Sequence, residues 1–300
     1  MYEQYYGLTE KPFSLTPDTE FYFQSLTHQQ ALNVLLVAIR SGDGFIKVTG
    51  EVGTGKTLLC RMLLDSLDDG FNTVYIPNPY MNCNALLDAL LAEMAIGEKL
   101  DGKNHLACIN DYLIETARSG KTTVIILDEA QSLPEESMEA IRLLSNLETE
   151  KNKLVQIVLF GQPELDSKLA QSSIRQLRQR IMHAYHLQPI DENSLRAYLH
   201  HRLKAAGYVG PELFVKEARQ ALYRVSRGIP RIINVLGNKA LMQAYASGEF
   251  YVSRKQIEAA ARDSDATPYP GMGSAPSRQG LQLAMLGLCT IAILLMGIYQ

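Results

Sequence analysis

The stretch GEVGTGKT at residues 50–57 decides the fold of this chain. It fills every fixed position of the pattern GxxxxGK[ST], in which glycines let backbone N–H groups surround the phosphates of a nucleotide. The helix that follows adds the partial positive charge of its N-terminus. Lys56 is expected to reach the β- and γ-phosphates, and the Thr57 hydroxyl to ligate Mg²⁺. The nucleotide-binding residues predicted in this stretch are Gly50, Glu51, Val52, Gly53, Thr54, Gly55, Lys56 and Thr57.

A second stretch, VIILDE at residues 124–129, places two carboxylates directly after four apolar residues. In doubly wound α/β folds the ligand lies at the carboxyl ends of the strands, where Asp128 and Glu129 would stand. Asp128 is therefore expected to hold Mg²⁺, directly or through water, and Glu129 to polarise the attacking water. The alternative is a pair of acids that cap the next helix. The two stretches together predict ATP and Mg²⁺ as cofactors and ATP hydrolysis as the reaction.

Apolar runs alternate with helical patterns on both sides of these stretches. The run at 122–127 is continuous and rich in β-branched residues, as in a strand that is covered on both faces. Such alternation predicts an α/β fold with a parallel five-stranded sheet and right-handed crossovers. The expected strands are 45–49, 73–76, 122–127, 154–160 and 184–187.

The strand pattern ends near residue 190, and only helical patterns follow it. They predict a small all-α lid domain with helices over about 191–206, 214–226, 231–247 and 253–262. The opening residues, rich in Tyr, Phe and Pro, are expected to form an extended arm packed on the main domain. The predicted organisation is an arm at 1–26, the α/β domain at 27–190, the lid at 191–262, a flexible linker at 263–280 and an apolar segment at 281–300.

The apolar segment holds nine Leu or Ile residues between Leu281 and Tyr299 and no charged residue. About 20 helical residues span the ~30 Å hydrocarbon core of a bilayer, so a transmembrane helix is expected there. Arg278 and the need for cytosolic ATP favour a cytoplasmic ATPase domain. The alternative is a buried core helix. The N-terminus has no basic region followed by an apolar run and therefore no secretory signal.

The charge and cysteine content of the chain say less about its binding partners than the motifs do. The net charge of −3 argues against a chain devoted wholly to nucleic acid. Residues 171–262 are nevertheless basic, with 15 Lys or Arg against 6 Asp or Glu. This excess is either a solvated helical face or a surface that meets phosphates or a partner. The four cysteines are scattered, which argues against a thiolate metal site and for a reducing compartment.

Further motifs give the chain a family resemblance. They are spread over nearly all of residues 1–262 and read YYGLTEKPFSLTPDTEFYF, GFIKVTGEVGTGKT, VIILDEAQSLP, VLFGQPEL, LRQRI and GIPRIIN. With these motifs the chain resembles an AAA+ ATPase, and within that class the ExeA/GspA-type ATPases of bacterial secretion and pilus assembly. The stretch YIPNPY and the chain length are similar to the MSHA type IV pilus subgroup. Longer members continue into a periplasmic peptidoglycan-binding region, and that activity is not carried over to this chain.

The resemblance implies roles for two polar residues near the γ-phosphate. Gln162 would be the sensor that orients water, with an exposed loop amide as the alternative. Asn78 would restrain Glu129 until a partner binds, with a simple turn as the alternative.

The resemblance also implies roles for arginines, whose guanidinium stabilises the charge that develops on a transferred phosphoryl group. Arg180 would reach the γ-phosphate of a neighbouring subunit, and Arg175 and Arg178 are the competing candidates. Arg231 would act as a second sensor that reports the nucleotide state from the lid.

The function implied is that of a single-pass ATPase of the bacterial inner membrane, with its ATPase domain in the cytoplasm. It would couple ATP hydrolysis to assembly of a secretion or type IV pilus system. The expected partners are further copies of the chain, arranged in a ring, and inner-membrane components of that system. The alternative is a DNA-binding AAA+ regulator of the transposition or partition type, motivated by the basic region. The apolar segment and the lack of a helix-turn-helix pattern argue against it, so nucleic acid is not an expected partner. A nucleotide switch without useful hydrolysis is a third hypothesis, disfavoured by the presence of Glu129.

Overall fold

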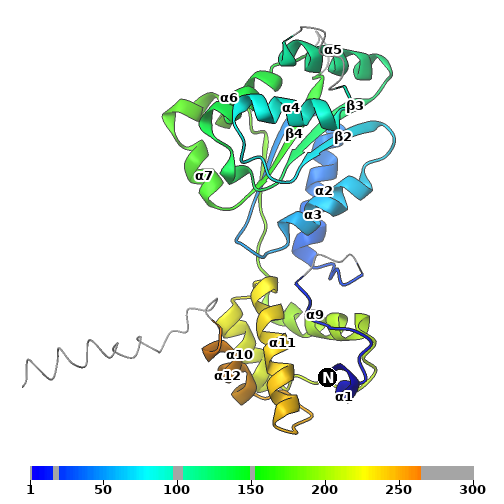
Figure 1. Cartoon of the computed structure of the whole chain (residues 1–300), viewed down its shortest axis with the longest axis vertical. Coiled ribbons are helices and arrows are strands. Elements are labelled where there is room, and N and C mark those ends of the chain that lie inside the picture. Colours follow the sequence, from blue (N-terminus) through cyan, green and yellow to red (C-terminus); the bar gives the residue numbers. More distant parts are fainter. Residues whose placement is uncertain (1, 16–19, 97–103, 149–152, 265–300) are drawn as a thin grey trace, which may run out of the picture.

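The computed structural model describes residues 2–15, 20–96, 104–148 and 153–264. They form an α/β lobe and a smaller helical lobe, with the N-terminal helix lying beside the helical lobe (Figure 1). The segment 281–300, predicted to cross the membrane, lies outside the described residues. Within the described part, no helix combines the length and apolar character that a membrane span requires.

The α/β lobe is built on one five-stranded sheet in the order β2–β3–β4–β1–β5. All four strand pairings are parallel, which confirms the predicted fold class. The observed ends differ from the predicted ones by at most two residues, the usual uncertainty of strand boundaries. The strands are β1 Phe45–Thr49, β2 Phe71–Ile76, β3 Thr122–Leu127, β4 Val155–Gly161 and β5 His183–His186.

Helices cover both faces of this sheet, which is why most residues of the central strands are apolar. On one face Val124 and Ile126 of β3 share a core with α2 and α3. On the other face Ile125 and Leu127 share a core with α4, α5 and α6. The helices and short 3₁₀ turns of this lobe are α2 Leu26–Ser41, α3 Lys56–Ser66, α4 Cys83–Glu93, α5 His105–Arg118, η2 Ala130–Ser132, α6 Glu135–Leu144, α7 Glu164–Leu169, η3 Ser172–Ile174 and α8 Arg175–Arg178.

The helical lobe, or lid, consists of α9 Glu192–Ala205, α10 Lys216–Ser226, α11 Pro230–Ala246 and α12 Arg254–Arg262. Side-chain caps mark the starts of α9 and α12. The Asp191 side chain accepts a hydrogen bond from Ser194 N at 3.0 Å at the start of α9. Ser253 and Gln256 form a capping box at the start of α12.

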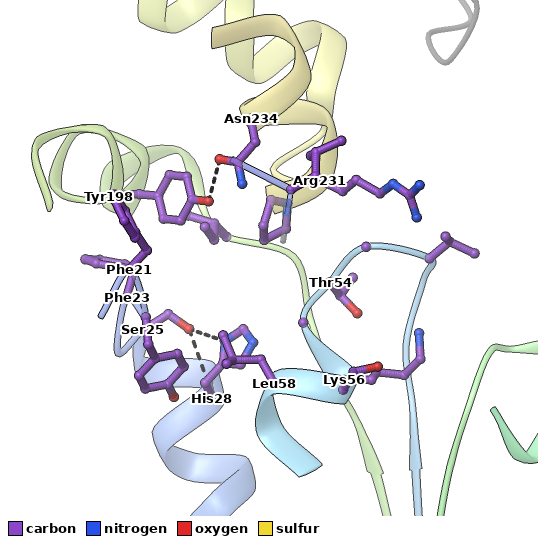
Figure 2. A pocket seen from close by; sticks show the side chains of 18 of the residues that line it. Phe21, Phe23, Ser25, His28, Thr54, Lys56, Leu58, Tyr198, Arg231 and Asn234 are labelled. Carbon is purple, nitrogen blue, oxygen red and sulfur yellow. Dashed lines mark hydrogen bonds between the residues drawn. The ribbon is translucent and has the colours of Figure 1, made fainter. Parts of the chain in front are cut away.

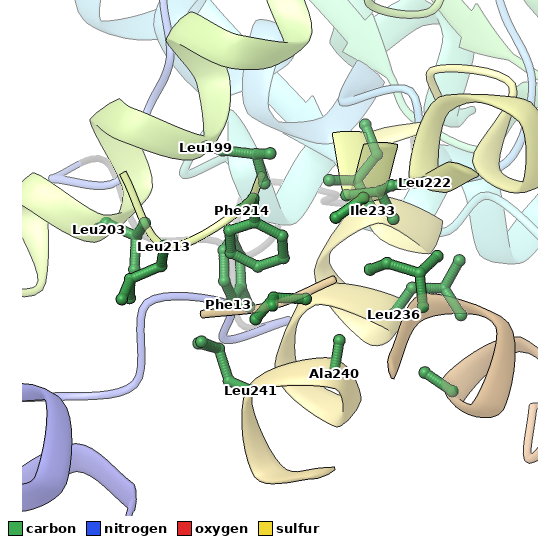
Figure 3. Packing of buried hydrophobic residues seen from close by; sticks show 14 of the residues in the cluster. Phe13, Leu199, Leu203, Leu213, Phe214, Leu222, Ile233, Leu236, Ala240 and Leu241 are labelled. Atoms are coloured by element: carbon green, nitrogen blue, oxygen red, sulfur yellow. The ribbon is translucent and has the colours of Figure 1, made fainter. Parts of the chain in front are cut away.

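The N-terminal arm packs on the lid, so the prediction that it packs on the main domain was wrong. Its helix α1, Tyr2–Tyr6, and Phe13 belong to the lid core, and Figure 3 shows Phe13 among Leu213, Phe214 and Leu241. The Tyr2 hydroxyl also donates to Asn238 Oδ1 at 2.6 Å. A four-helix lid is small for a stable core, and the aromatic side chains of the arm enlarge the apolar surface that it buries.

Candidate nucleotide-binding site

A pocket of about 340 Å³ lies between the two lobes, at the carboxyl ends of the strands. Its wall is made by the glycine-rich loop, the ends of β3 and β4, the arm and the lid. This is the edge of an α/β sheet where ligands bind. The residues that line it include Ser25, His28, Gly53, Thr54, Gly55, Lys56, Thr57, Glu129, Gln162, Arg202 and Arg231.

The glycine-rich loop follows β1 directly, and α3 begins at Lys56. Gly55 has φ +100°, and a Cβ at this position would lie 2.7 Å from His28 Nε2, so glycine is required there. Lys56 Nζ donates to the carbonyl oxygens of Gly50 and Glu51 at 2.8 and 2.9 Å. The ammonium group of Lys56, which was predicted to bind phosphate, is therefore hydrogen-bonded to the backbone of its own loop. Burial lowers the pKa of Lys56, and neighbouring carboxylates oppose that shift.

The two predicted Mg²⁺ ligands lie side by side. Thr57 Oγ1 donates to Asp128 Oδ2 at 2.7 Å, and the backbone N–H of Glu129 donates to Asp128 Oδ1 at 2.9 Å. Asp128 is buried, and burial raises the pKa of its carboxyl while both hydrogen bonds lower it. A hydroxyl and a carboxylate at one point fit Mg²⁺, which takes a few protein oxygens and completes its shell with phosphates and water.

Glu129 stands just past the end of β3 in the left-handed backbone region, with φ +53°. Its Oε2 accepts hydrogen bonds from Gln162 Nε2 at 3.1 Å and from Gln131 Nε2 at 2.5 Å. The structure therefore brings Gln162, predicted from the family resemblance, to the predicted water-polarising residue. Asn78 is placed differently, because it is exposed after β2 and its Oδ1 accepts from Tyr80 N at 3.2 Å.

Arg231 lies at the start of α11 and reaches the glycine-rich loop from the lid. Its backbone N–H donates to Gly53 O at 3.2 Å, and a Cβ at Gly53 would lie 2.4 Å from the Cβ of Arg231. Figure 2 shows the Arg231 side chain on the side of the lid that faces the loop. The backbone of Arg231 is thus in direct contact with the glycine-rich loop.

Arg180 lies near the amino ends of the strands, whereas the pocket lies at their carboxyl ends. Two residues further on, Met182 N donates to the carbonyl of Phe45 at the start of β1, whereas the glycine-rich loop follows the end of β1. Arg180 Nη1 donates to Ser145 O at 3.0 Å. The side chains of Arg175 and Arg178 are exposed, without a hydrogen bond or ion pair to any described residue. None of the three candidates is among the described residues that line the nucleotide pocket of their own chain.

Two further residues of the pocket, Ser25 and His28, were missed from the sequence. Ser25 Oγ caps α2 by accepting from His28 N at 3.2 Å, and it lies 2.6 Å from His28 Nδ1 (Figure 2). Burial lowers the pKa of His28, while a hydrogen bond with the Thr54 backbone opposes the shift. Ser25 and His28 stand directly after the opening motif of the chain, which was the one signal that could have indicated them.

Comparison with known proteins defines the class. Residues 39–169 match the family model described as AAA domain. Among solved structures, Cdc6p from Pyrobaculum aerophilum has a TM-score of 0.62 at 18% identity, covering 84% of this chain and 70% of that one. ORC2 from Aeropyrum pernix, in its ADPNP–ADP complexes, has a TM-score of 0.60 at 17% identity, covering 86% and 72%. The chain therefore contains an AAA domain and shares the fold of these structures.

Over nearly its whole length the chain is similar to general secretion pathway protein A. It is 40% identical to that protein from Aeromonas hydrophila over 294 residues, which is 97% of this chain. The chain spans about half, 53%, of the relative's length. The predicted ExeA/GspA resemblance is thereby confirmed.

Proposed function

We propose that this chain hydrolyses ATP to drive the assembly of a bacterial secretion system or a type IV pilus of the MSHA kind. The observation that carries the proposal is the convergence of Thr57, Asp128, Glu129 and Gln162 at one edge of the sheet. The likeness to general secretion pathway protein A supports the process, although this chain spans only about half of that relative.

Each of these side chains has a different role in the proposed reaction. Lys56 leaves the carbonyls of its loop for the β- and γ-phosphates, while Thr57 and Asp128 hold Mg²⁺, which offsets phosphate charge when bound. Glu129 accepts a proton from the attacking water, and Gln162 orients that water. Arg231 couples the occupied loop to the lid.

A neighbouring subunit completes the site in this proposal. Arg180 stands at the far edge of the sheet, so the γ-phosphate that it serves belongs to another copy. AAA+ ATPases of this kind oligomerise, and a repeated contact between two different surfaces forms a ring where the rotation between neighbouring subunits closes. The ring is held at the inner membrane by the segment 281–300, with the ATPase domain in the cytoplasm.

Binding to DNA is the second candidate function, and the basic lid favours it. The chain also shares its fold with ORC1 of Aeropyrum pernix, whose structure was solved in complex with DNA; the TM-score between the two is 0.58. Several lid cations are engaged in ion pairs, however. Glu212 pairs with Arg196 and Arg219, Asp263 with Lys239, and Glu258 with Arg254. These pairs reduce the charge available to phosphates. Binding to duplex DNA that weakens steeply with added salt would favour this candidate.

The proposal is tested with a variant that binds ATP but cannot hydrolyse it. Glu129→Gln keeps the shape of the side chain but cannot accept the proton, so ATP-dependent partners should accumulate. The full chain carrying this change is crosslinked in native membranes with ATP, and co-purifying proteins are identified. Lys56→Ala, which lacks the phosphate contact, is the matched control that should not accumulate them. Recovery of inner-membrane secretion or pilus components supports the proposal, whereas recovery of DNA and DNA-acting enzymes contradicts it.

A further inference from the structure

The turn after β3 contains a second amide side chain beside Glu129, that of Gln131. It belongs to the 3₁₀ turn η2 and is half-buried. Its side chain bridges two parts of the site. Nε2 donates to Glu129 Oε2 at 2.5 Å, and Oε1 accepts from the backbone N–H of Gln162 at 3.0 Å. One amide thus connects the ends of β3 and β4.

The orientation of this amide follows from its partners. A backbone N–H can only donate, so the oxygen of the Gln131 amide has to face Gln162 N. The NH₂ group is then directed at Glu129 and can only donate to it. Gln131 therefore favours a Glu129 side chain that accepts, which is the form a general base requires.

Both amide donors converge on the same atom of Glu129. Gln162 Nε2, at 3.1 Å, and Gln131 Nε2 bind Oε2, whereas Oε1 accepts no hydrogen bond from any described residue. With Oε2 fixed, the rotation of the carboxylate is defined, and Oε1 is the atom left to meet water. An aligned base is far more effective than a mobile one, because the reacting atoms start near their reactive geometry.

The turn that carries Gln131 is itself anchored. Lys168 of α7 donates to the backbone oxygens of Gln131, at 3.2 Å, and of Leu133. Behind the amide, a Cβ at Gly161 would lie only 3.2 Å from Gln131 Oε1, so the glycine leaves the space that this side chain occupies. Glu129, with its positive φ, is a residue that such surroundings must hold in place.

We propose that Gln131 is a positioning residue for ATP hydrolysis, which fixes the Glu129 carboxylate and ties it to the Gln162 sensor. The inference rests on the role proposed for Glu129. It assigns to Gln131 an effect on turnover, and none on nucleotide binding, because Gln131 contacts the carboxylate rather than the glycine-rich loop.

The experiment compares Gln131→Glu and Gln131→Met in the full chain. The first keeps the shape and the acceptor for Gln162 N but places a carboxylate against Glu129, and the second removes both hydrogen bonds. We expect kcat to fall about tenfold or more while KM for ATP changes less than about threefold. Gln30→Glu and Gln30→Met, at an exposed position of α2, are the matched controls and should keep wild-type kinetics. Thermal unfolding of each variant verifies that it is folded.

The same changes are then made in a Glu129→Gln background. Because Gln131 acts through Glu129, they should cause no further loss of kcat there. Wild-type kcat in both Gln131 variants, a rise in kcat, or an equal loss with and without Glu129 would overturn the inference. If Glu129→Gln alone keeps wild-type turnover, the proposed role of Glu129 fails instead, so the two failures are distinguishable.

Discussion

Asp128 is the residue whose chemistry most directly connects stability with function. It is buried, and burial raises the pKa of its carboxyl. The folded protein therefore holds this proton more tightly than the unfolded chain does. The stabilisation from this group is complete at low pH and is lost as the pH rises from the ordinary aspartate value through the raised one. At neutral pH the ionised, buried carboxylate therefore lowers the stability of the folded protein when no cation is bound.

Replacing Asp128 with Asn should separate these two effects. Without nucleotide, we expect the variant to unfold at the same temperature as the wild type or higher at pH 7, with the difference shrinking at acidic pH. Mg²⁺-dependent ATP hydrolysis should fall by about 100-fold or more. Thermal unfolding over a pH series and steady-state turnover measure the two. A variant that is clearly less stable than the wild type at pH 7 would contradict the electrostatic account.

Among single residues, those that belong to short continuous motifs could be predicted from the sequence. Gly55, Lys56 and Thr57 are adjacent, and Asp128 follows an apolar strand, so their convergence follows from the parallel sheet alone. Gln131 could not be predicted, because its role depends on the contact between two strand ends that lie about 30 residues apart in the chain. His28 depends likewise on the meeting of α2 with the glycine-rich loop.

Among the elements, the arm was predicted to exist but was assigned to the wrong lobe. Apolar residues without periodicity show that a segment is buried somewhere, and they do not show against what. Arg202 on α9 shows the actual connection. Its Nε donates to Pro12 O at 2.6 Å, its Nη2 donates to Ser14 O at 3.0 Å, and its guanidinium lies 4.5 Å from the ring centre of Phe21. The arm therefore belongs to the lid.

Arg202→Met should release the arm while sparing the α/β lobe. Two carbonyl groups lose a charged donor, so we expect a loss of about 2–4 kcal/mol in the free energy of unfolding, measured by denaturant titration. Limited proteolysis should cut within the first 15 residues. Arg196→Met on the same helix is the matched control, because its exposed ion pair contributes about 1 kcal/mol or less. Equal losses for the two arginines would refute this connection.

The junction between the lobes depends on a second element, the turn before α11. Ile190 N donates to Gly228 O at 2.9 Å, and a Cβ at Gly228 would lie 1.9 Å from Ile190 O. Gly228 has φ +76°, and Gly248 has φ +70° with open space around it. These two glycines share a backbone conformation but differ in surroundings.

Replacing each of these two glycines with alanine should therefore separate the cost of backbone strain, which both share, from the cost of the steric clash with Ile190, which only Gly228 has. Gly248→Ala should cost about 1 kcal/mol of unfolding free energy. Gly228→Ala should cost about 3 kcal/mol or more and should lower ATP turnover, because the turn before α11 has to move away from the segment that connects β5 to α9. Chemical denaturation and steady-state kinetics measure both effects. Equal costs at the two positions would mean that the junction is not tightly packed.

For the whole molecule, the α/β class and the parallel sheet could be predicted because alternating strands and helices permit few topologies. The packing of the arm and the way the lid closes the pocket could not, since both depend on contacts between segments far apart in the chain. The position of Arg180, far from the pocket of its own chain, leads to the central claim that two subunits share one site.

The most direct test of that claim is a mixture of two inactive variants. Arg180→Ala retains Glu129, and Glu129→Gln retains Arg180, so each chain lacks a different half of the shared site. If Arg180 acts on the neighbouring subunit, equal mixing restores ATP hydrolysis, because about a quarter of the contacts then join an intact Glu129 to an intact Arg180. Recovered turnover in the mixture, with neither variant active alone, is the predicted result. A mixture as inactive as its components would contradict it and would mean that Arg180 does not complete a neighbour's site.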